Sequence, residues 1–324
     1  MRIALPAAID TGLLAGCDPT AAIIDWGGET MGTRWSVRAV LPAGTDAATI
    51  RTAIVARFDG LVAEMSQWQP WSDLSRFNRA AAGSWTVLSP DFAHVIAEAL
   101  AIAQVTDGAF DPTLGRLVDL WGFGPTPTAA PPQEAAIADA LAASGWQRLA
   151  YSPSDRRLRQ PGGLSLDLSG IAKGFAVDAI ADLLGRAGIS HALVEIGGEL
   201  VGRGMRPDGQ PWWVDLESPP GLSLGPLRIA LHGLAVATSG DYRRGRHTLD
   251  PRTGHPIAHG TVAVSVLAPT ALAADAWATA LTVLPPAAAV ALATEHAIAG
   301  RIVTTGDGTV EERLTPALRA MLAD

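Results

Sequence analysis

The sequence predicts an α+β fold in which helices pack against mixed β-sheets. Helical and strand-like segments neither alternate regularly nor form an uninterrupted series of strands, and most of the expected strands gather in the C-terminal half. No dinucleotide fingerprint with three spaced glycines follows the first expected strand, so a doubly wound nucleotide-binding fold is the weaker alternative.

In the N-terminal half, periodic apolar spacing predicts helices joined by polar loops. A strand is expected over residues 33–40, and helices over residues 47–65, 90–106 and 133–144. The connections expected between them are a polar, aromatic loop over residues 66–78, a turn over 106–115, an exposed Pro-rich linker or lid over 125–132, and a hairpin over 148–167.

In the C-terminal half, strands predominate over helices. Residues 191–203 are expected to form two strands joined by a double-glycine turn, and further strands are expected over residues 212–217, 227–231, 235–238 and 261–267. The two expected helices follow the strand that ends at Asp167 and the Pro-Thr pair at residues 269–270.

Composition limits the classes of partner. The 324 residues include 34 Gly and 23 Pro and are 48% hydrophobic, which is typical of a globular, loop-rich protein of one large or two modest domains. A formal net charge of −8 argues against a wide basic surface for nucleic acid. The single cysteine, Cys17, excludes an internal disulfide and a cysteine-based metal site.

The N-terminus raises a question of targeting. The sequence LAGC, ending at Cys17, resembles the processing site of a bacterial lipoprotein, but only Arg2 supplies positive charge and Asp10 interrupts the apolar stretch. We therefore expect residues 1–28 to be either a degenerate lipoprotein signal or an ordinary strand and loop, followed by one domain over residues 29–324. A cytoplasmic location is favoured, or a periplasmic, membrane-anchored one if Cys17 is lipidated. No later apolar run reaches the ~20 residues that span a bilayer.

The segment over residues 164–188 carries the first chemical motif. A strand ending in Asp167 is expected to pass through Ser169 and Gly170 into a helix that bears Lys173. Because free backbone N–H groups and an ammonium then converge at one helix N-terminus, this turn is expected to bind a phosphate and its metal.

The second motif lies on the helix expected after Thr270. Asp275 and Thr279 are four residues apart and share one helix face. With a backbone carbonyl near Gly170, they could supply the oxygen ligands that Mg²⁺ prefers. From this pair alone, however, the simpler hypothesis is that Asp275 caps or salt-bridges locally and that Thr279 packs.

The third motif is a long polar loop over residues 238–257. His247 could accept a proton near neutral pH, although a solvent-facing or structurally bonded histidine is the commoner case. The arginines of this loop could hold phosphate or be solvated, and Asp250 suits a plain turn at least as well as a chemical role.

Seven motifs, in order, resemble the ApbE-type FAD:protein FMN transferase family. They cover nearly the whole chain, which makes chance similarity improbable. The motifs are MGT (residues 31–33), SDLSRFN (72–78), DGAFDPTLGRLVDLWGFG (107–124), LDLSGIAKGFAVD (166–178), VEIGGEL (194–200), SGDYRRGRHTLDPRTGHPI (239–257) and ALAADAWATAL (271–281).

The resemblance implies an ApbE-like fold and a Mg²⁺-dependent enzyme. Its substrate is FAD, from which FMN passes to a threonine or serine hydroxyl of an acceptor flavoprotein while AMP is released. The metal would be held by Asp275, Thr279 and the carbonyl of Gly170, a position where some relatives carry threonine. His247 is the candidate base for the acceptor hydroxyl, with Asp275 as its rival. An FAD pyrophosphatase that yields FMN and AMP, or a non-catalytic FAD-binding protein, are the alternatives.

The resemblance also implies a set of flavin-binding positions. Trp68, where relatives often have tyrosine, offers a flat ring for stacking, and Asp167 can accept hydrogen bonds from a ring or a ribose. The positions carried over are Met31, Trp68, Ala109, Phe110, Asp111, Asp167, Lys173 and Leu249.

Overall fold

An antiparallel sheet of eight strands organises the computed structural model, which describes residues 1–6, 9, 12, 16–128, 130–242, 245–306 and 308–323. All neighbouring pairs in this sheet are antiparallel. From edge to edge, the strands are β14 (Thr309–Leu314), β13 (Ala299–Gly306), β12 (Thr261–Ala268), β11 (Leu234–Ser239), β8 (Glu199–Arg203), β7 (Ala192–Ile196), β3 (Thr33–Val40) and β2 (Ile23–Thr30).

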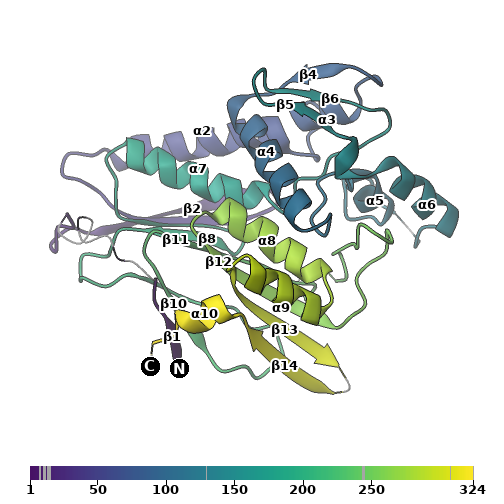
Figure 1. Cartoon of the computed structure of the whole chain (residues 1–324). Helices are drawn as coiled ribbons and strands as arrows, with labels where there is room; N and C mark the ends of the chain where they lie inside the picture. The colour runs from purple at the N-terminus through teal and green to yellow at the C-terminus, as the bar shows by residue number, and fades with distance from the viewer. Residues whose placement is uncertain are drawn as a thin grey trace.

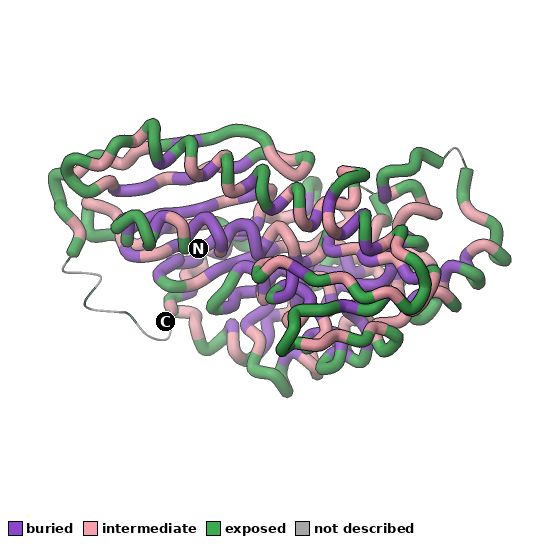
Figure 2. The backbone as a smooth tube through the Cα atoms, turned by 90° about the horizontal axis from the view of Figure 1, so that it is seen from above, coloured by how far each residue is buried: buried purple, intermediate pink, exposed green. Residues whose placement is uncertain are grey.

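Helices cover one face of this sheet (Figure 1). They are α2 (Ala47–Met65), α4 (Pro90–Val105), α7 (Ala172–Arg186), α8 (Ala271–Val283) and α9 (Pro286–Glu295). Three of them begin at a side chain that accepts a hydrogen bond from the first turn, namely Asp46 at α2, Ser89 at α4 and Thr270 at α8. The main hydrophobic core lies between these helices and the sheet, and Figure 2 shows the buried stretches gathered inside an exposed outer layer.

A smaller three-stranded sheet packs on the other face. It consists of β1 (Arg2–Ala4), β10 (Leu227–Leu231) and β9 (Trp212–Asp215), with β1 parallel to β10, and α10 (Pro316–Ala320) lies beside it. Strand alternation divides the two cores: Ala235 and Ala237 of β11 face the helices, whereas Val236 packs with the second cluster.

The first residues of the chain are part of this second layer. Arg2 donates to Glu312 of β14 at 2.6 Å, and Ala323 N donates to the carbonyl of Ile3 at 2.8 Å. The division expected after residue 28 stays a prediction; strand β2 runs across it. Asp10, and Leu14 and Ala15 of the LAGC sequence, lie outside the described residues. Within the part of the chain that is described, no helix is long and apolar enough to cross a membrane.

A third group of short elements lies at one end of the helical layer (Figure 1). It contains the sheet β4 (Trp85–Val87), β6 (Arg157–Arg159) and β5 (Ala150–Ser152), the helices α3 (Asp73–Asn78), α5 (Gly115–Leu120) and α6 (Glu134–Ala143), and a 3₁₀ turn, Trp146–Arg148. The α+β fold class is confirmed, as are the predicted helices within a residue or two.

Two local predictions are wrong. The expected loop over residues 66–78 ends in helix α3, because Ser72 caps a short helical turn by accepting from Ser75 N at 3.0 Å. The expected strand ending at Asp167 makes only a single bridge, Ser165 to Leu114. Instead, the amide of Asn78 accepts from Leu166 N at 2.8 Å and donates to Leu166 O at 3.0 Å, so a side chain takes the place of a partner strand.

Helices α7 and α8 lie unusually close together. A Cβ atom at Gly174 would come within 2.2 Å of the carbonyl oxygen of Ala271, so only glycine permits this approach. Next to it, the carboxylate of Asp178 on α7 accepts hydrogen bonds from the first N–H groups of α8, Ala271 N at 2.9 Å and Leu272 N at 2.8 Å. The two helices are therefore joined through the start of α8.

Candidate functional site

A cavity of about 370 Å³ opens where the start of α7 meets α8 and the surrounding loops. Its volume falls in the ~300–1,000 Å³ range of small-molecule sites. All twelve site residues predicted from the sequence line it, which shows that segments far apart in the chain converge there. They are Met31, Trp68, Ala109, Phe110, Asp111, Asp167, Gly170, Lys173, His247, Leu249, Asp275 and Thr279.

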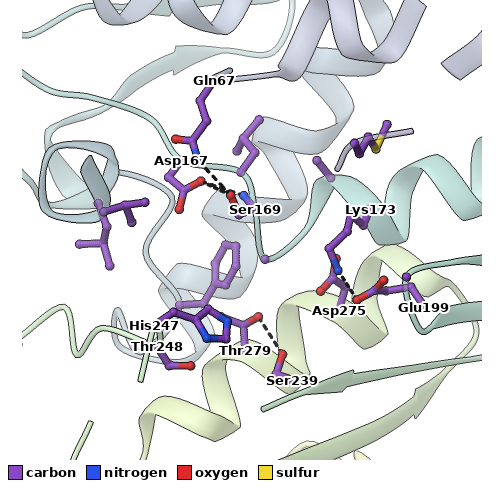
Figure 3. A pocket seen from close by; sticks show the side chains of 18 of the residues that line it. Gln67, Asp167, Ser169, Lys173, Glu199, Ser239, His247, Thr248, Asp275 and Thr279 are labelled. Carbon is purple, nitrogen blue, oxygen red and sulfur yellow. Dashed lines mark hydrogen bonds and ion pairs between the residues drawn. The ribbon is translucent and has the colours of Figure 1, made fainter. Parts of the chain in front are cut away.

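Three charged side chains meet at the end of the cavity near α7 (Figure 3). Lys173 Nζ donates a hydrogen bond to Glu199 Oε1, and the backbone N–H of Gly174 donates to Asp275 Oδ2 at 3.1 Å. The second oxygen of Glu199, Oε2, is buried and has no hydrogen-bond partner among the described residues. A buried carboxylate oxygen without a hydrogen bond is unusual in a folded protein.

The Asp275 carboxyl is held in a strongly perturbed environment. Burial raises its pKa to about 7; the positive charge of Lys173 opposes the rise and the negative charge of Glu199 adds to it. A buried carboxylate whose pKa is raised in this way is stabilised by a bound cation, because the cation replaces the proton as its partner.

Hydroxyl and backbone oxygens lie next to these charges. The hydroxyls of Thr279 and Ser239 are 3.2 Å apart. A Cβ at Gly170 would come within 2.8 Å of Thr279 Oγ1, so the bare backbone of Gly170 rests directly on this hydroxyl. Any side chain at residue 170 would require Thr279 to move.

The turn at Asp167 is held by local hydrogen bonds. Asp167 Oδ1 accepts from Ser169 N at 3.0 Å and from Ser169 Oγ at 2.6 Å, and Gln67 Nε2 donates to Ser169 Oγ at 3.2 Å. Burial raises the pKa of Asp167, while these hydrogen bonds from Ser169 oppose the rise. The turn therefore joins the loop that carries Gln67 to the start of α7, as Figure 3 shows.

Aromatic and apolar side chains also line the cavity. Phe110 and Leu249 are buried, whereas Trp68 keeps 58% of its surface exposed and stands at the edge of the cavity. Met31 lies in the two-residue turn between β2 and β3 with φ of 50°, followed by Gly32 with φ of 71°. Two successive positive φ values are the signature of a tight hairpin turn, which places Met31 at the cavity.

Asp111 lines the cavity, but its carboxylate is engaged by the chain. Oδ1 accepts from Thr113 N at 2.8 Å and from Thr113 Oγ1 at 2.6 Å, and Oδ2 accepts from Trp146 N at 3.1 Å. Burial raises the pKa of this carboxyl, and the three hydrogen bonds oppose the rise. Through these hydrogen bonds, Asp111 stabilises the loop that carries Ala109 and Phe110.

His247 presents one nitrogen to a ligand. Its Nδ1 lies 3.0 Å from the carbonyl oxygen of Gly245 and 3.3 Å from Asp241 Oδ1. A carbonyl can only accept, so Nδ1 carries the hydrogen and Nε2 is left as an acceptor in the neutral ring. Arg243 and Arg244, the loop's candidate phosphate ligands, lie outside the described residues.

Sequence reasoning missed three contributors to this site. Glu199 follows the double-glycine turn of a hairpin, and Ser239 ends strand β11; neither pattern suggests a partner on α7 or α8. Asn78 stands far along the chain from Leu166, whose backbone it binds. Throughout the described ranges, no group of three or more His, Cys, Asp and Glu side chains is arranged to hold a metal, so a metal here would also need hydroxyl and carbonyl oxygens.

Comparisons with known proteins agree on one family. The model of the ApbE family matches residues 31–302. The chain is 38% identical to the FAD:protein FMN transferase of Klebsiella pneumoniae strain 342, over 96% of this chain and 94% of that protein. It is 37% identical to the FAD:protein FMN transferase of Escherichia coli K12, over 91% of this chain and 88% of that protein.

Solved structures show the same likeness. The flavinyl transferase ApbE of Pseudomonas stutzeri, in its apo form, superposes with a TM-score of 0.86 at 35% identity, over 93% of this chain and 97% of that one. The flavin transferase ApbE from Vibrio cholerae superposes with a TM-score of 0.88 at 33% identity, over 93% and 99%.

Proposed function

The chain belongs to the ApbE family, and we propose that it transfers FMN from FAD to a serine or threonine hydroxyl of an acceptor flavoprotein. In this proposal Mg²⁺ is required and AMP is the second product. The observation that carries it is that one cavity joins an aromatic wall, which suits a flavin or adenine ring, to a charged end with Lys173, Asp275 and Thr279, which suits a pyrophosphate and its metal.

The residues present fit Mg²⁺. Asp275 offers a carboxylate, Thr279 a hydroxyl, and Gly170, whose backbone rests on that hydroxyl, a carbonyl. Hard oxygen ligands of this kind leave positions for water and substrate phosphates, as Mg²⁺ requires. When bound there, Mg²⁺ would neutralise pyrophosphate charge and make AMP a better leaving group.

The chain's own groups then have distinct tasks. The hydroxyl oxygen of the acceptor bonds to the phosphorus on the FMN side, the bond from that phosphorus to the bridging oxygen breaks, and AMP leaves with the bridging oxygen. Lys173, steadied by Glu199, supplies positive charge at the pyrophosphate end of the cavity. His247 takes the hydroxyl proton on Nε2, with Asp275 as the alternative base.

A direct test uses a lysate of cells that lack this protein. Purified protein, FAD and Mg²⁺ are added, proteins are separated under denaturing conditions, and covalent flavin is detected by fluorescence in the gel. The labelled protein is then purified, and the modified peptide is expected to gain the mass of FMN minus one water on a serine or threonine, with one AMP released per FMN attached.

The other outcomes separate the alternatives. Free FMN and AMP without an adduct would identify a pyrophosphatase, and bound FAD without AMP would identify a passive carrier. His247→Ala should bind FAD as the wild type does but transfer FMN at least ~100-fold more slowly. An unchanged transfer rate would remove His247 from the chemistry.

The compartment of the acceptor depends on Cys17. Its thiol lies 3.7 Å from the carbonyl oxygen of Met205, and burial raises its pKa. We propose a cytoplasmic enzyme, with lipidation of Cys17 as the alternative that would place its acceptors in the cell envelope. Fractionation of cells expressing the wild type or Cys17→Ala tests this, because a membrane-bound wild type and a released variant would overturn the proposal.

A further inference from the structure

A second cavity of about 280 Å³ lies on the opposite face of the large sheet from the helices. It is enclosed by strands β7, β8 and β11 of that sheet and by β9 of the smaller sheet. Leu200 and Val236 line it, and both pack with the second hydrophobic cluster rather than with the helices. None of the flavin or metal positions described above lines this cavity.

The two cavities share a wall. Gly197, Thr238 and Gly240 line both of them. Ser239, between two of these residues, reaches the hydroxyl of Thr279, and Glu199 lies two residues after Gly197. The second cavity therefore adjoins the part of the first that holds Thr279 and Glu199, where the phosphate chemistry is proposed.

Two of the three residues of the shared wall are glycines. A Cβ at Gly240 would come within 2.6 Å of the ring of Tyr242 and 2.7 Å of the carbonyl oxygen of Val262, and a Cβ at Gly197 would come within 2.9 Å of Thr33. Because glycine has no side chain, these neighbours pack directly against the backbone, and only the backbone of Gly197 and Gly240 separates the two cavities at these positions.

The charge of the second cavity differs from that of the first. Glu195, Asp215 and Glu217 line it, and its described lining residues include no Lys, Arg or His, whereas Lys173 and His247 line the first cavity. Asp215 is paired with Arg228 at 2.7 Å, and Glu195 accepts from Ser36 Oγ at 3.1 Å. Carboxylates repel phosphates and accept hydrogen bonds from peptide N–H groups and hydroxyls.

Resting on the proposed transfer reaction, we infer that the second cavity receives the acceptor: an extended, uncharged or basic polypeptide segment whose serine or threonine hydroxyl enters the charged end past Gly197 and Gly240. The cavity, about 280 Å³, has room for a short part of such a segment, and its carboxylates disfavour a phosphate-bearing ligand. FAD and the acceptor then occupy opposite faces of the sheet and meet at the ends of its strands.

Filling the second cavity from its far wall tests this inference. Val214 on β9 lines only the second cavity, and Val214→Trp would occupy it without reaching the first. Val310→Trp on β14 is the matched control, because Val310 is 41% exposed and lines neither cavity. A milder variant, Glu195→Gln, removes one charge at constant size and serves if Val214→Trp does not fold.

The measurements are FAD affinity by flavin fluorescence and the kinetics of FMN transfer to the acceptor purified in the lysate assay. Val214→Trp should keep its FAD dissociation constant within about twofold of the wild type and lose at least about tenfold in kcat/KM for the acceptor, mostly through KM. Glu195→Gln should raise that KM about threefold, and Val310→Trp should change neither quantity.

Two results would overturn the inference. A Val214→Trp variant that transfers FMN as fast as the wild type would show that the acceptor approaches elsewhere, and a tenfold loss of FAD affinity would show that the second cavity holds part of FAD. Failure of the proposed function has a different outcome, because the wild type itself would then attach no FMN to any protein.

Discussion

Gly174 is where the fold and the site depend on the same contact. Replacing it by alanine would place a Cβ 2.2 Å from the carbonyl oxygen of Ala271 and 2.8 Å from the Cα of Leu272, both of them backbone atoms that cannot rotate away. Ordinary contact begins at 3.4 Å, so α7 and α8 would have to separate by about 1.2 Å.

The cost can be assembled from the contacts that this separation disturbs. Overpacking of a buried helix contact costs about 2 kcal/mol. Stretching the two hydrogen bonds from the N-terminus of α8 to the Asp178 carboxylate costs about 3 kcal/mol more. The higher helix propensity of alanine offsets about 1 kcal/mol of this cost, so the free energy of unfolding of Gly174→Ala should fall by about 4 kcal/mol.

Urea denaturation followed by far-UV circular dichroism measures this change, and the thermal midpoint should fall by roughly 8 °C. Gly185→Ala is the matched control on the same helix, because its Cβ would meet nothing nearer than Arg203 Nη1 at 3.8 Å. That variant should gain several tenths of a kcal/mol. If the free energy of unfolding of Gly174→Ala is within ~1 kcal/mol of the wild-type value, the argument that α7 and α8 are held at their closest possible distance is refuted.

Three further predictions concern the groups around this contact. Burial raises the pKa of Asp178 to about 6, above its usual 3.8, so the folded state binds the proton more tightly than the unfolded state does. The free energy of unfolding should therefore fall by about 3 kcal/mol as pH rises from ~4 to ~6. Asp178→Asn should flatten that pH dependence in urea titrations, and an equally steep slope would contradict the assignment. Thr279→Val should raise the Mg²⁺ concentration for half-maximal transfer about tenfold while metal-free FAD affinity stays the same, and an unchanged Mg²⁺ profile would remove Thr279 from the metal site. Asn78→Ala leaves the N–H and C=O of Leu166 without partners and should cost about 3 kcal/mol in urea denaturation, with weaker FAD binding because the adjoining Asp167 turn moves; full stability would show that water replaces the amide.

Periodicity predicted most helices of the site because their apolar faces bury in one continuous core. The helices bearing Lys173 and Asp275 keep the apolar spacing of a surface that faces a sheet. The residues that place these helices side by side leave no periodic pattern in the sequence. They are one glycine, Gly174, and one capping carboxylate, Asp178, and any helix could carry residues of these types. The helices that carry Lys173 and Asp275 were therefore predictable, but the contact that aligns them was not.

The Asp167 segment shows how a correct pattern gave a wrong element. Leu164, Leu166 and Leu168 alternate and are all buried, as a strand would require. Leu166 is bonded through its N–H and C=O to the side-chain amide of Asn78, which comes from a distant part of the chain, and the carbonyl of Leu164 accepts from Gln160 Nε2, four residues earlier. Alternation reports which side of a segment is buried and carries no information about what satisfies its hydrogen bonds.

Glu199 was missed for a related reason. Its place after a double-glycine turn predicts a hairpin and nothing more. Only the packing of β8 against α7 brings its carboxylate to Lys173, and its other oxygen is buried with no hydrogen-bond partner among the residues that the structure describes. Pairs of charges that meet between elements distant in sequence have no local pattern.

The wide separation of the cavity residues along the chain also bears on how the protein is made. Met31 is among the first residues of the cavity to leave the ribosome, whereas Asp275 and Thr279 follow only when most of the chain has been synthesised. Strands β13 and β14, which complete the sheet beneath α8 and α9, come later still. Non-local contacts form only after both partners are present. A nascent or truncated chain that ends before α8 therefore has no complete cavity in which to bind FAD.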